Sequence, residues 1–305
     1  MDIIDSHSHI GYDWCWGKSD IEGYEKVSRI EGITTALLMP APGQIDFKTG
    51  KRIILYEYDK NGFTYSSELT DKLPNTRIIN KQIHDIIKSY NGDLNIKFIP
   101  LIHPLLDNSE YLYELIELYN PVAFKIHGVA TRVIPSLITK EFITHLKIIG
   151  IPIIVHTDYL NNCNSIFDSI RNENSGYNWC KFFVNNDLRG YITHGSRLDP
   201  QAFEMINKNE NLVIGCGPDS LMKNNRNRLF NDLINDLNDI NILKILKENL
   251  NIDKILFDID YSWNVKNSQS KEIDYDGVNR VKDIFSNKHE YEKVLSLNAK
   301  RFFKI

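Results

Sequence analysis

The sequence predicts an α/β fold, specifically a (β/α)8 TIM barrel formed by one domain that spans residues 1–305. Short, apolar, β-rich segments alternate with longer amphipathic segments, which indicates β-α-β units and a parallel sheet. Eight such segments in a chain of 305 residues favour a closed barrel over an open doubly wound sheet. No Gly-x-Gly-x-x-Gly follows the first of them, which disfavours a dinucleotide-binding fold.

The predicted strands are short apolar runs, and several of them end in a histidine or an aspartate. In chain order they are Ile3–His7, Thr34–Met39, Ile96–Ile102, Val122–His127, Ile151–His156, Gly190–His194, Leu212–Cys216 and Ile255–Asp260. Between most of them, apolar residues recur at helical spacing. These patterns predict helices at Thr70–Tyr90, Glu110–Leu118, Lys140–Ile149, Pro200–Asn207 and Leu229–Glu248.

One segment after the second predicted strand departs from this alternation. Residues 46–67 contain two β-rich runs separated by Lys60-Asn61-Gly62, and Asn-Gly between such runs predicts a β-hairpin insertion. Because it follows a barrel strand, this hairpin is expected at the carboxyl-terminal face, as a lid or as an oligomer contact. A surface insertion without a function is an equally good interpretation.

Composition limits the classes of partner. Hydrophobic residues make up 42% and charged residues 25% of the chain, and the formal net charge is only -4. This charge favours neither nucleic acid nor an anionic membrane as a partner. No apolar stretch is long enough to span a membrane, and no secretory leader is evident at the start, so we expect a cytoplasmic protein. The four cysteines form no Cys-x-x-Cys pair and are expected to be reduced.

The first predicted strand carries two histidines, His7 and His9. Residues two positions apart on a strand point to the same side, so both imidazoles can reach one ligand. Neutral imidazole is the commonest ligand for transition metals in proteins, and two on one face form half of a zinc site. Taken alone the pair is weak evidence, because such pairs also occur on exposed strands.

Later strands supply matching residues by parity. In the segment 122–127, Lys125 and His127 alternate with apolar residues, and Asp258 and Asp260 do the same near the end of the last strand. Barrel strands pack one face against the helices and turn the other face inward. We therefore expect these four polar side chains inside the barrel, towards the mouth where such enzymes have their active sites.

Two further histidines close predicted strands: His156 ends the fifth strand and His194 ends the sixth. One buried histidine at a strand end is usually a hydrogen-bonded core residue. A set of three imidazoles and a carboxylate from His7, His9, His156 and Asp260 is different, because it leaves room for water as a catalytic zinc-type site requires. The combination favours a metal site.

These segments resemble motifs of the amidohydrolase superfamily, especially its amidohydrolase-2 branch of metal-dependent hydrolases and decarboxylases. The matching runs occur in the order of the family and cover nearly the whole chain: Asp5-Ser-His-Ser-His, Phe124-Lys-Ile-His, Ile154-Val-His-Thr, Thr193-His-Gly, Phe257-Asp-Ile-Asp-Tyr and Asn298-Ala-Lys-Arg-Phe-Phe. The fifth run is similar to a Phe-Gly-Ser-Asp-Tyr sequence of the family, with Asp260 in the place of its aspartate.

The resemblance implies that His7, His9 and His156 bind one divalent metal ion, zinc or manganese, with Asp260 as a ligand or nearby base. A bound metal lowers the pKa of water to about 7 and so provides hydroxide at neutral pH. Asp260 can accept the proton of that water and pass it to a leaving group. His194 is expected to polarise the scissile carbonyl or to hold the developing oxyanion.

Lys125 has three interpretations. In binuclear relatives a lysine on the fourth strand is carboxylated and bridges two metals, and His156 and His194 would then serve the second metal. The Lys-x-His pattern is more similar to mononuclear members, in which this lysine supports the site or the substrate. A structural interpretation pairs the inward lysine with Asp5 or Asp258. Of these, we favour a single metal.

For the substrate, Arg197 follows His194 by three residues and is expected to clamp a carboxylate, although a surface salt bridge explains it equally well. Lys125 and His127 are further candidates for substrate binding. The sequence predicts a hydrolase that acts on an amide, lactone or ester of a small molecule. The alternative is a non-oxidative decarboxylase of an aromatic or unsaturated acid, and a non-catalytic barrel is a third interpretation. Whether the chain forms a homo-oligomer stays open.

Overall fold

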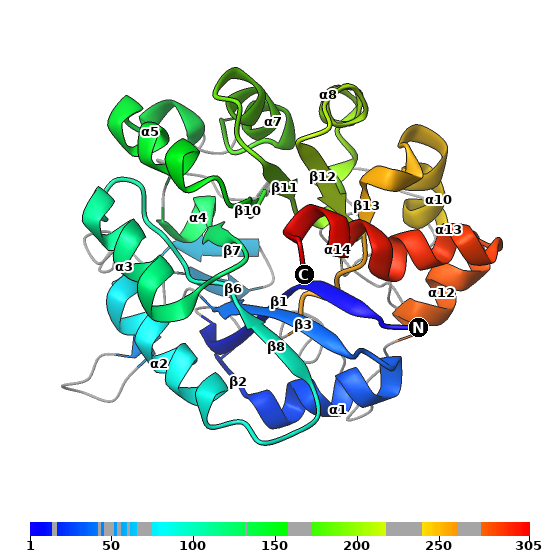
Figure 1. The fold of residues 1–305 in the computed structure, drawn as a ribbon, viewed down its shortest axis with the longest axis horizontal. Coiled ribbons are helices and arrows are strands. Elements are labelled where there is room, and N and C mark those ends of the chain that lie inside the picture. The colour runs from blue at the N-terminus through cyan, green and yellow to red at the C-terminus, as the bar shows by residue number, and fades with distance from the viewer. Residues whose placement is uncertain are drawn as a thin grey trace.

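The fold is seen in a computed structural model. It describes residues 1–13, 17–41, 44–45, 52–53, 56–59, 62–65, 75–131, 133–157, 173–217, 240–261 and 276–305. In Figure 1 the strands occupy the centre and helices surround them, which is the arrangement expected from alternating β and α segments. Within this described part of the chain, no helix is both long enough and apolar enough to cross a membrane.

The strands form two main sheets. The first has the order β2-β1-β3-β8, with β1 (Ile4–Asp13), β2 (Gly17–Ser19), β3 (Thr35–Pro40) and β8 (Asn95–Phe98). The second has the order β13-β12-β11-β10-β9, with β9 (Phe124–Ile126), β10 (Ile153–Val155), β11 (Gly190–Ile192), β12 (Leu212–Gly215) and β13 (Ile255–Leu256). All of these neighbours pair in parallel except β1 and β2.

Backbone hydrogen bonds join the two sheets at both of their edges. At one edge, the Lys125 N–H donates to the Pro100 carbonyl oxygen over 2.9 Å, and the Lys125 carbonyl accepts from the Ile102 N–H over 2.8 Å. At the other edge, the Asp260 N–H donates to the His7 carbonyl over 2.9 Å. The strands therefore follow one another around a barrel in chain order, although neither edge has a continuous ladder.

The helices lie outside the strands (Figure 1). They are α1 (Ile21–Glu31), α2 (Thr76–Lys88), α3 (Ser109–Tyr119), α4 (Gly128–Thr131), α5 (Lys140–Ile149), α7 (Gly176–Asn185), α8 (Pro200–Lys208), α10 (Ile240–Asn249), α12 (Gly277–Ile284), α13 (Lys288–Glu292) and α14 (Asn298–Phe303). Short helical turns are η2 (Pro135–Leu137), η3 (His194–Leu198), η5 (Ile252–Lys254) and η6 (Lys293–Leu297). Polar caps start the longer helices; the Asn75 side chain, for example, accepts from the Ile78 N–H.

Helix α5 has the predicted bounds, whereas several strands are shorter than predicted. The strand predicted at 190–194 ends at Ile192, and the one predicted at 255–260 ends at Leu256. His194 and Asp260 themselves cannot be strand residues, because their φ angles are 57° and 46°. The starts of two predicted helices, at 70–74 and 229–239, lie outside the described residues.

The predicted insertion at 46–67 is only partly described. Strands β6 (Tyr56–Asp59) and β7 (Gly62–Tyr65) pair antiparallel, with Asp59 opposite Gly62. Two shorter strands, β4 (Gln44–Ile45) and β5 (Arg52–Ile53), form another antiparallel pair. The predicted turn residues Lys60 and Asn61 lie outside the described residues. A lid or oligomer contact at this segment stays a prediction.

Two apolar clusters confirm the predicted alternation. Phe124, Ile126 and Phe257 lie in the larger cluster, between the strands and the helices. A smaller cluster lines the barrel interior and is closed by Phe302 and Phe303 of α14, which Figure 1 shows lying over the strands. We call this smaller cluster the inner apolar layer; its buried residues in or next to the strands are Ile4, Leu37, Met39, Ile99, Ala123, Ile154, Tyr191, Val213 and Leu256.

Side-chain hydrogen bonds tie the C-terminal segments to the rest of the barrel. The Asn298 side-chain amide donates to the carbonyl oxygens of Ile252 and Ile255 over 2.8 and 2.9 Å, and so fixes the start of β13. The buried Glu31 carboxylate accepts from the N–H groups of Gly277 and Val278 over 3.1 and 2.8 Å. Glu31 thereby joins the end of α1 to the start of α12, where the helix dipole stabilises its negative charge.

Candidate metal centre

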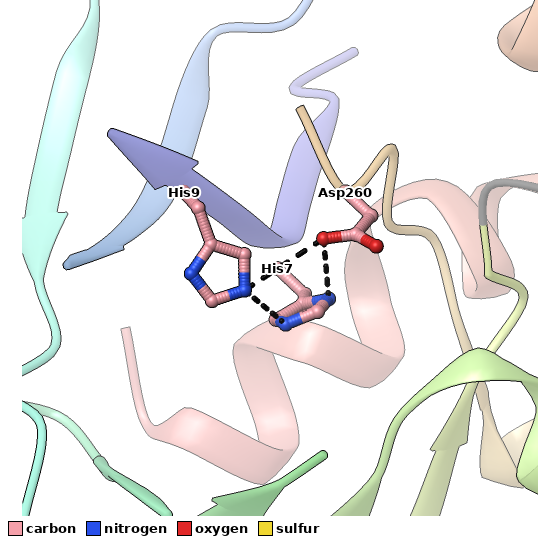
Figure 2. A group of neighbouring side chains, drawn as sticks. All are labelled: His7, His9 and Asp260. Atoms are coloured by element: carbon pink, nitrogen blue, oxygen red, sulfur yellow. Dashed lines mark hydrogen bonds and ion pairs between the residues drawn. The ribbon is translucent and has the colours of Figure 1, made fainter. Parts of the chain in front are cut away.

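Three side chains from opposite ends of the sequence converge at one end of the barrel (Figure 2). His7 and His9 lie on β1 and Asp260 follows β13, and each can offer a ligand atom within 4.8 Å of the others. The two Nε2 atoms are 3.0 Å apart. Asp260 Oδ1 lies 3.7 Å from His9 Nε2 and 3.7 Å from His7 Nδ1. All three side chains are buried, so little water surrounds them.

The imidazoles of this group are neutral. Burial and the nearby Lys125 lower the pKa of His9 to about 3, and the same causes hold the pKa of His7 well below its ordinary value. His9 Nδ1 lies 3.1 Å from the Pro40 carbonyl oxygen. Because a carbonyl can only accept, Nδ1 carries the hydrogen, and the lone pair of His9 Nε2 faces His7 and Asp260.

The chemistry of these donors fits a divalent metal ion. Two imidazole nitrogens only 3.0 Å apart, with a carboxylate oxygen 3.7 Å from one of them, are donors of the kind that bind such an ion. His7, His9 and Asp260 would therefore hold the metal, as the sequence predicts for these three residues.

His156 lies outside this group of three and belongs to a neighbouring histidine cluster. Its Nδ1 is 2.8 Å from His194 Nε2, and its ring stacks on that of His127 with centroids 4.0 Å apart. His194 Nδ1 lies 3.6 Å from Asp260 Oδ2. Asp260 thus lies between the His7–His9 pair and His194. The fourth ligand role of His156 and the substrate role of His127 stay predictions.

Lys125 projects into the barrel, as its parity predicts, and is fully buried. Its Nζ lies 2.9 Å from His7 Nε2. Burial lowers the pKa of Lys125 to about 7, although the negative charges of Asp260 and Asp258 oppose this shift. A lysine in this state is a base as well as a cation near neutral pH, which fits either a contact with substrate or carboxylation.

A second aspartate, Asp258, lies deeper in the barrel than Asp260. Its Oδ2 accepts from the Tyr191 hydroxyl over 2.7 Å, and its Oδ1 accepts from the Gly217 N–H over 2.5 Å. Burial raises the pKa of Asp258 to about 7, against the opposing effect of these two bonds. The sequence predicts Asp258 as an inward carboxylate. It does not identify Tyr191 as its hydrogen-bond donor, because a tyrosine on a barrel strand is usually a packing residue.

Asp5, one of the two predicted partners of Lys125, bonds to residues of β1, α1 and the segment after β13. Its carboxylate accepts from the hydroxyls of Ser8 and Tyr24 over 2.5 and 2.6 Å and from the N–H groups of His7 and Ile259 over 3.2 and 3.1 Å. The strand pairing of β1 shifts register between Asp5 and Ser8. Asp5 therefore fixes the irregular stretch of β1 that orients His7.

The backbone is strained where the predicted catalytic residues lie. Asp260 has a φ of 46°, and His194 begins a turn in which Gly195, Ser196 and Leu198 also have positive φ angles. For residues other than glycine such conformations cost about 1–3 kcal/mol each and persist where the surroundings enforce them. Gly217 makes room for this turn, since a Cβ at that position would lie 3.0 Å from His194 Cα.

One predicted site residue, Arg197, and one further buried histidine, His103, lie near strand ends. Arg197 lies in η3 after β11, and its side chain is outside the described residues, so its role as a carboxylate clamp stays a prediction. His103 is fully buried near the end of β8, its Nδ1 accepts from the Leu105 N–H over 3.3 Å, and burial lowers its pKa to about 4.

The sequence matches no family model and no curated protein. Solved structures do match. A 5-carboxyvanillate decarboxylase from Sphingomonas paucimobilis has a TM-score of 0.64 at 12% identity, over 100% of this chain and 99% of the other. A probable 2-pyrone-4,6-dicarboxylic acid hydrolase from Acinetobacter baumannii, with citric acid bound, has a TM-score of 0.59 at 14% identity over the whole of both chains.

A third structure, a 5-carboxyvanillate decarboxylase from Novosphingobium aromaticivorans with bound manganese, has a TM-score of 0.58 at 11% identity, over 92% of this chain and 80% of the other. Another match carries the name amidohydrolase 2 and covers 100% of this chain. Identities this low establish the fold and no more. The chain therefore has the fold of the amidohydrolase-2 proteins, the branch that its motifs resemble.

Proposed function

We propose that this protein is a metal-dependent hydrolase that cleaves an amide, lactone or ester bond of a small molecule. The observation that carries the proposal is the buried group of His7, His9 and Asp260, with His194 on the far side of the same carboxylate. A divalent metal bound there would supply water of lowered pKa as the nucleophile. Zinc or manganese fits the nitrogen and oxygen donors.

The residues around the group divide the remaining work. Asp260 Oδ1 faces the two histidines and its Oδ2 faces His194, so this carboxylate can accept a proton on one side and release it towards the leaving group on the other. His194, whose Nδ1 lies 3.6 Å from Asp260 Oδ2, would hold the carbonyl oxygen of the substrate as it gains charge. The burial of the site excludes water and strengthens both interactions.

Non-oxidative decarboxylation of an aromatic or unsaturated acid is the second candidate. It is favoured by the buried Lys125, a cation or base inside the barrel that could hold a substrate carboxylate. Of the matched structures described above, two are decarboxylases by name and one is a hydrolase by name. Release of carbon dioxide without incorporation of labelled water into the product would select decarboxylation, and incorporation would select hydrolysis.

The test is metal analysis of the purified protein followed by a substrate screen of lactones, amides and carboxylic acids. We expect about one equivalent of zinc or manganese, its loss in His9→Ala and His156→Ala, and loss of turnover on removal of the metal. His145→Ala, on the outer helix α5, is the matched control and should retain both metal and turnover. About two equivalents would instead support a carboxylated Lys125. No binding after resupply of divalent ions would contradict the proposal.

A further inference from the structure

We propose that Asp258 is a positioning residue for the metal centre: it keeps the hydrogen of His7 on Nδ1, so that the Nε2 lone pair can bind the metal in place of its contact with Lys125. The metal part of this inference rests on the proposed function. Asp258 is not one of the three converging ligands, and the motif that its segment resembles has glycine at this position.

The first step is the hydrogen-bond pattern of Asp258. Its two oxygens receive one donor each, the Gly217 N–H over 2.5 Å and the Tyr191 hydroxyl over 2.7 Å. An amide N–H can only donate, so this side chain is held as an acceptor. Its Oδ2 is also 3.8 Å from His7 Nδ1, the buried nitrogen that has no hydrogen-bond partner among the described residues.

The second step is the state of His7. Lys125 Nζ lies 2.9 Å from His7 Nε2, and as an ammonium it can only donate there, which leaves the His7 hydrogen on Nδ1. His7 Nδ1 lies 3.7 Å from Asp260 Oδ1 and 3.8 Å from Asp258 Oδ2, both longer than a hydrogen bond. Asp260 also faces His9 and His194 and is itself a candidate ligand. Asp258 is therefore the carboxylate that remains for His7 when a metal is bound.

The third step is the space made for this carboxylate. A Cβ on Gly215 would lie 2.2 Å from Asp258 Oδ2 and 2.5 Å from the Tyr191 hydroxyl oxygen. Gly217, which donates to Asp258, has a φ of 78° and lies against the backbone of His194. Two glycines at the end of β12 thus accommodate Asp258, and this one side chain links β1, β11, β12 and β13 beneath the site.

The test is the tautomer of His7 in metal-free protein labelled with nitrogen-15 histidine, together with the zinc affinity measured by competition with a chromophoric chelator. In Asp258→Asn, the side-chain amide oxygen must accept the hydrogen bond from the Gly217 N–H. The NH2 group of the asparagine therefore faces His7 Nδ1. We expect the His7 hydrogen to move to Nε2 and zinc affinity to fall about 10–100-fold. Tyr191→Phe keeps the carboxylate and is the matched control, with the Nδ1–H tautomer retained and affinity within about fivefold.

The inference is overturned if Asp258→Asn keeps both the Nδ1–H tautomer and a zinc affinity within twofold of the wild type. It is also overturned if wild-type His7 carries its hydrogen on Nε2, a measurement that needs no variant to fold. A wild type that binds no zinc contradicts the proposed function instead, and the tautomer of His7 in the wild type and Asp258→Asn then still decides the role of Asp258.

Discussion

The two halves of the barrel interior are equally buried but opposite in chemistry. The inner apolar layer consists mainly of aliphatic side chains and is closed by Phe302 and Phe303. Among its described residues, Tyr191 alone has a side-chain hydrogen bond, which it donates to Asp258. Towards the other end lies a polar layer, which we define as His7, Lys125, His194, Asp258 and Asp260. The inner apolar layer buries hydrophobic side chains, which favours folding. The polar layer buries ionisable side chains, which costs free energy.

This difference separates stability from function. Burial raises the pKa of Asp258 to about 7 and lowers the pKa of Lys125 to about 7, so both side chains are held in surroundings that disfavour their charged forms. Groups of this kind contribute little stability or reduce it, and they persist where chemistry requires them. The comparison predicts that substitutions in the polar layer impair activity and that substitutions in the inner apolar layer impair folding.

The largest expected effect is on turnover. Asp260→Asn removes a candidate ligand and the proposed proton acceptor, so we expect turnover to fall at least about 10³-fold. In chelator-treated protein the melting temperature should stay unchanged or rise, because a buried carboxylate becomes a neutral amide of similar size. Asp85→Asn, on the exposed face of α2, is the control. Turnover within tenfold of the wild type would remove Asp260 from the mechanism.

The converse substitution lies in the inner apolar layer. Phe303→Ala leaves a cavity beneath the strands, and we expect it to reduce the free energy of unfolding by about 3–5 kcal/mol. Metal content per folded molecule should not change. The control is Leu297→Ala, since Leu297 is 45% exposed in the preceding helical turn, and its effect should stay within about 0.5 kcal/mol. Loss of metal in folded Phe303→Ala would show that the two layers are coupled.

The smallest expected effect is a change of the melting temperature with pH. Burial lowers the pKa of His103 to about 4 and that of His9 to about 3, whereas an unfolded histidine titrates near 6.5. Below pH 6.5 the unfolded chain therefore binds protons that the folded protein does not, and stability falls as the pH falls. The raised pKa of Asp258, about 7, acts in the opposite direction, so the test uses metal-free Asp258→Asn, which should melt several degrees lower at pH 5 than at pH 7. A pH-independent melting temperature of this variant would show that these histidines are not buried as described.

Most of the correct predictions came from two patterns: the alternation of polar and apolar residues within strands, and the order of the motifs along the chain. Alternation placed Lys125 and Asp258 inside the barrel and Phe124 and Phe257 outside, as the structure has them. The strand ends were wrong at His194, because a positive φ depends on the packing of a neighbouring element. The Tyr191–Asp258 bond escaped prediction for a similar reason, since it joins residues 67 positions apart.

The clamp between Glu31 and the start of α12 joins residues 246 and 247 positions apart, and the Ile259 N–H bonds to Asp5 across 254 positions. During synthesis, the strand that carries His7 and His9 leaves the ribosome long before the residues that orient it. Such non-local contacts slow folding and expose unpaired strand edges in the meantime. Because the last candidate ligand, Asp260, arrives on the same late segment, tight metal binding would report that the newly made chain has closed its barrel.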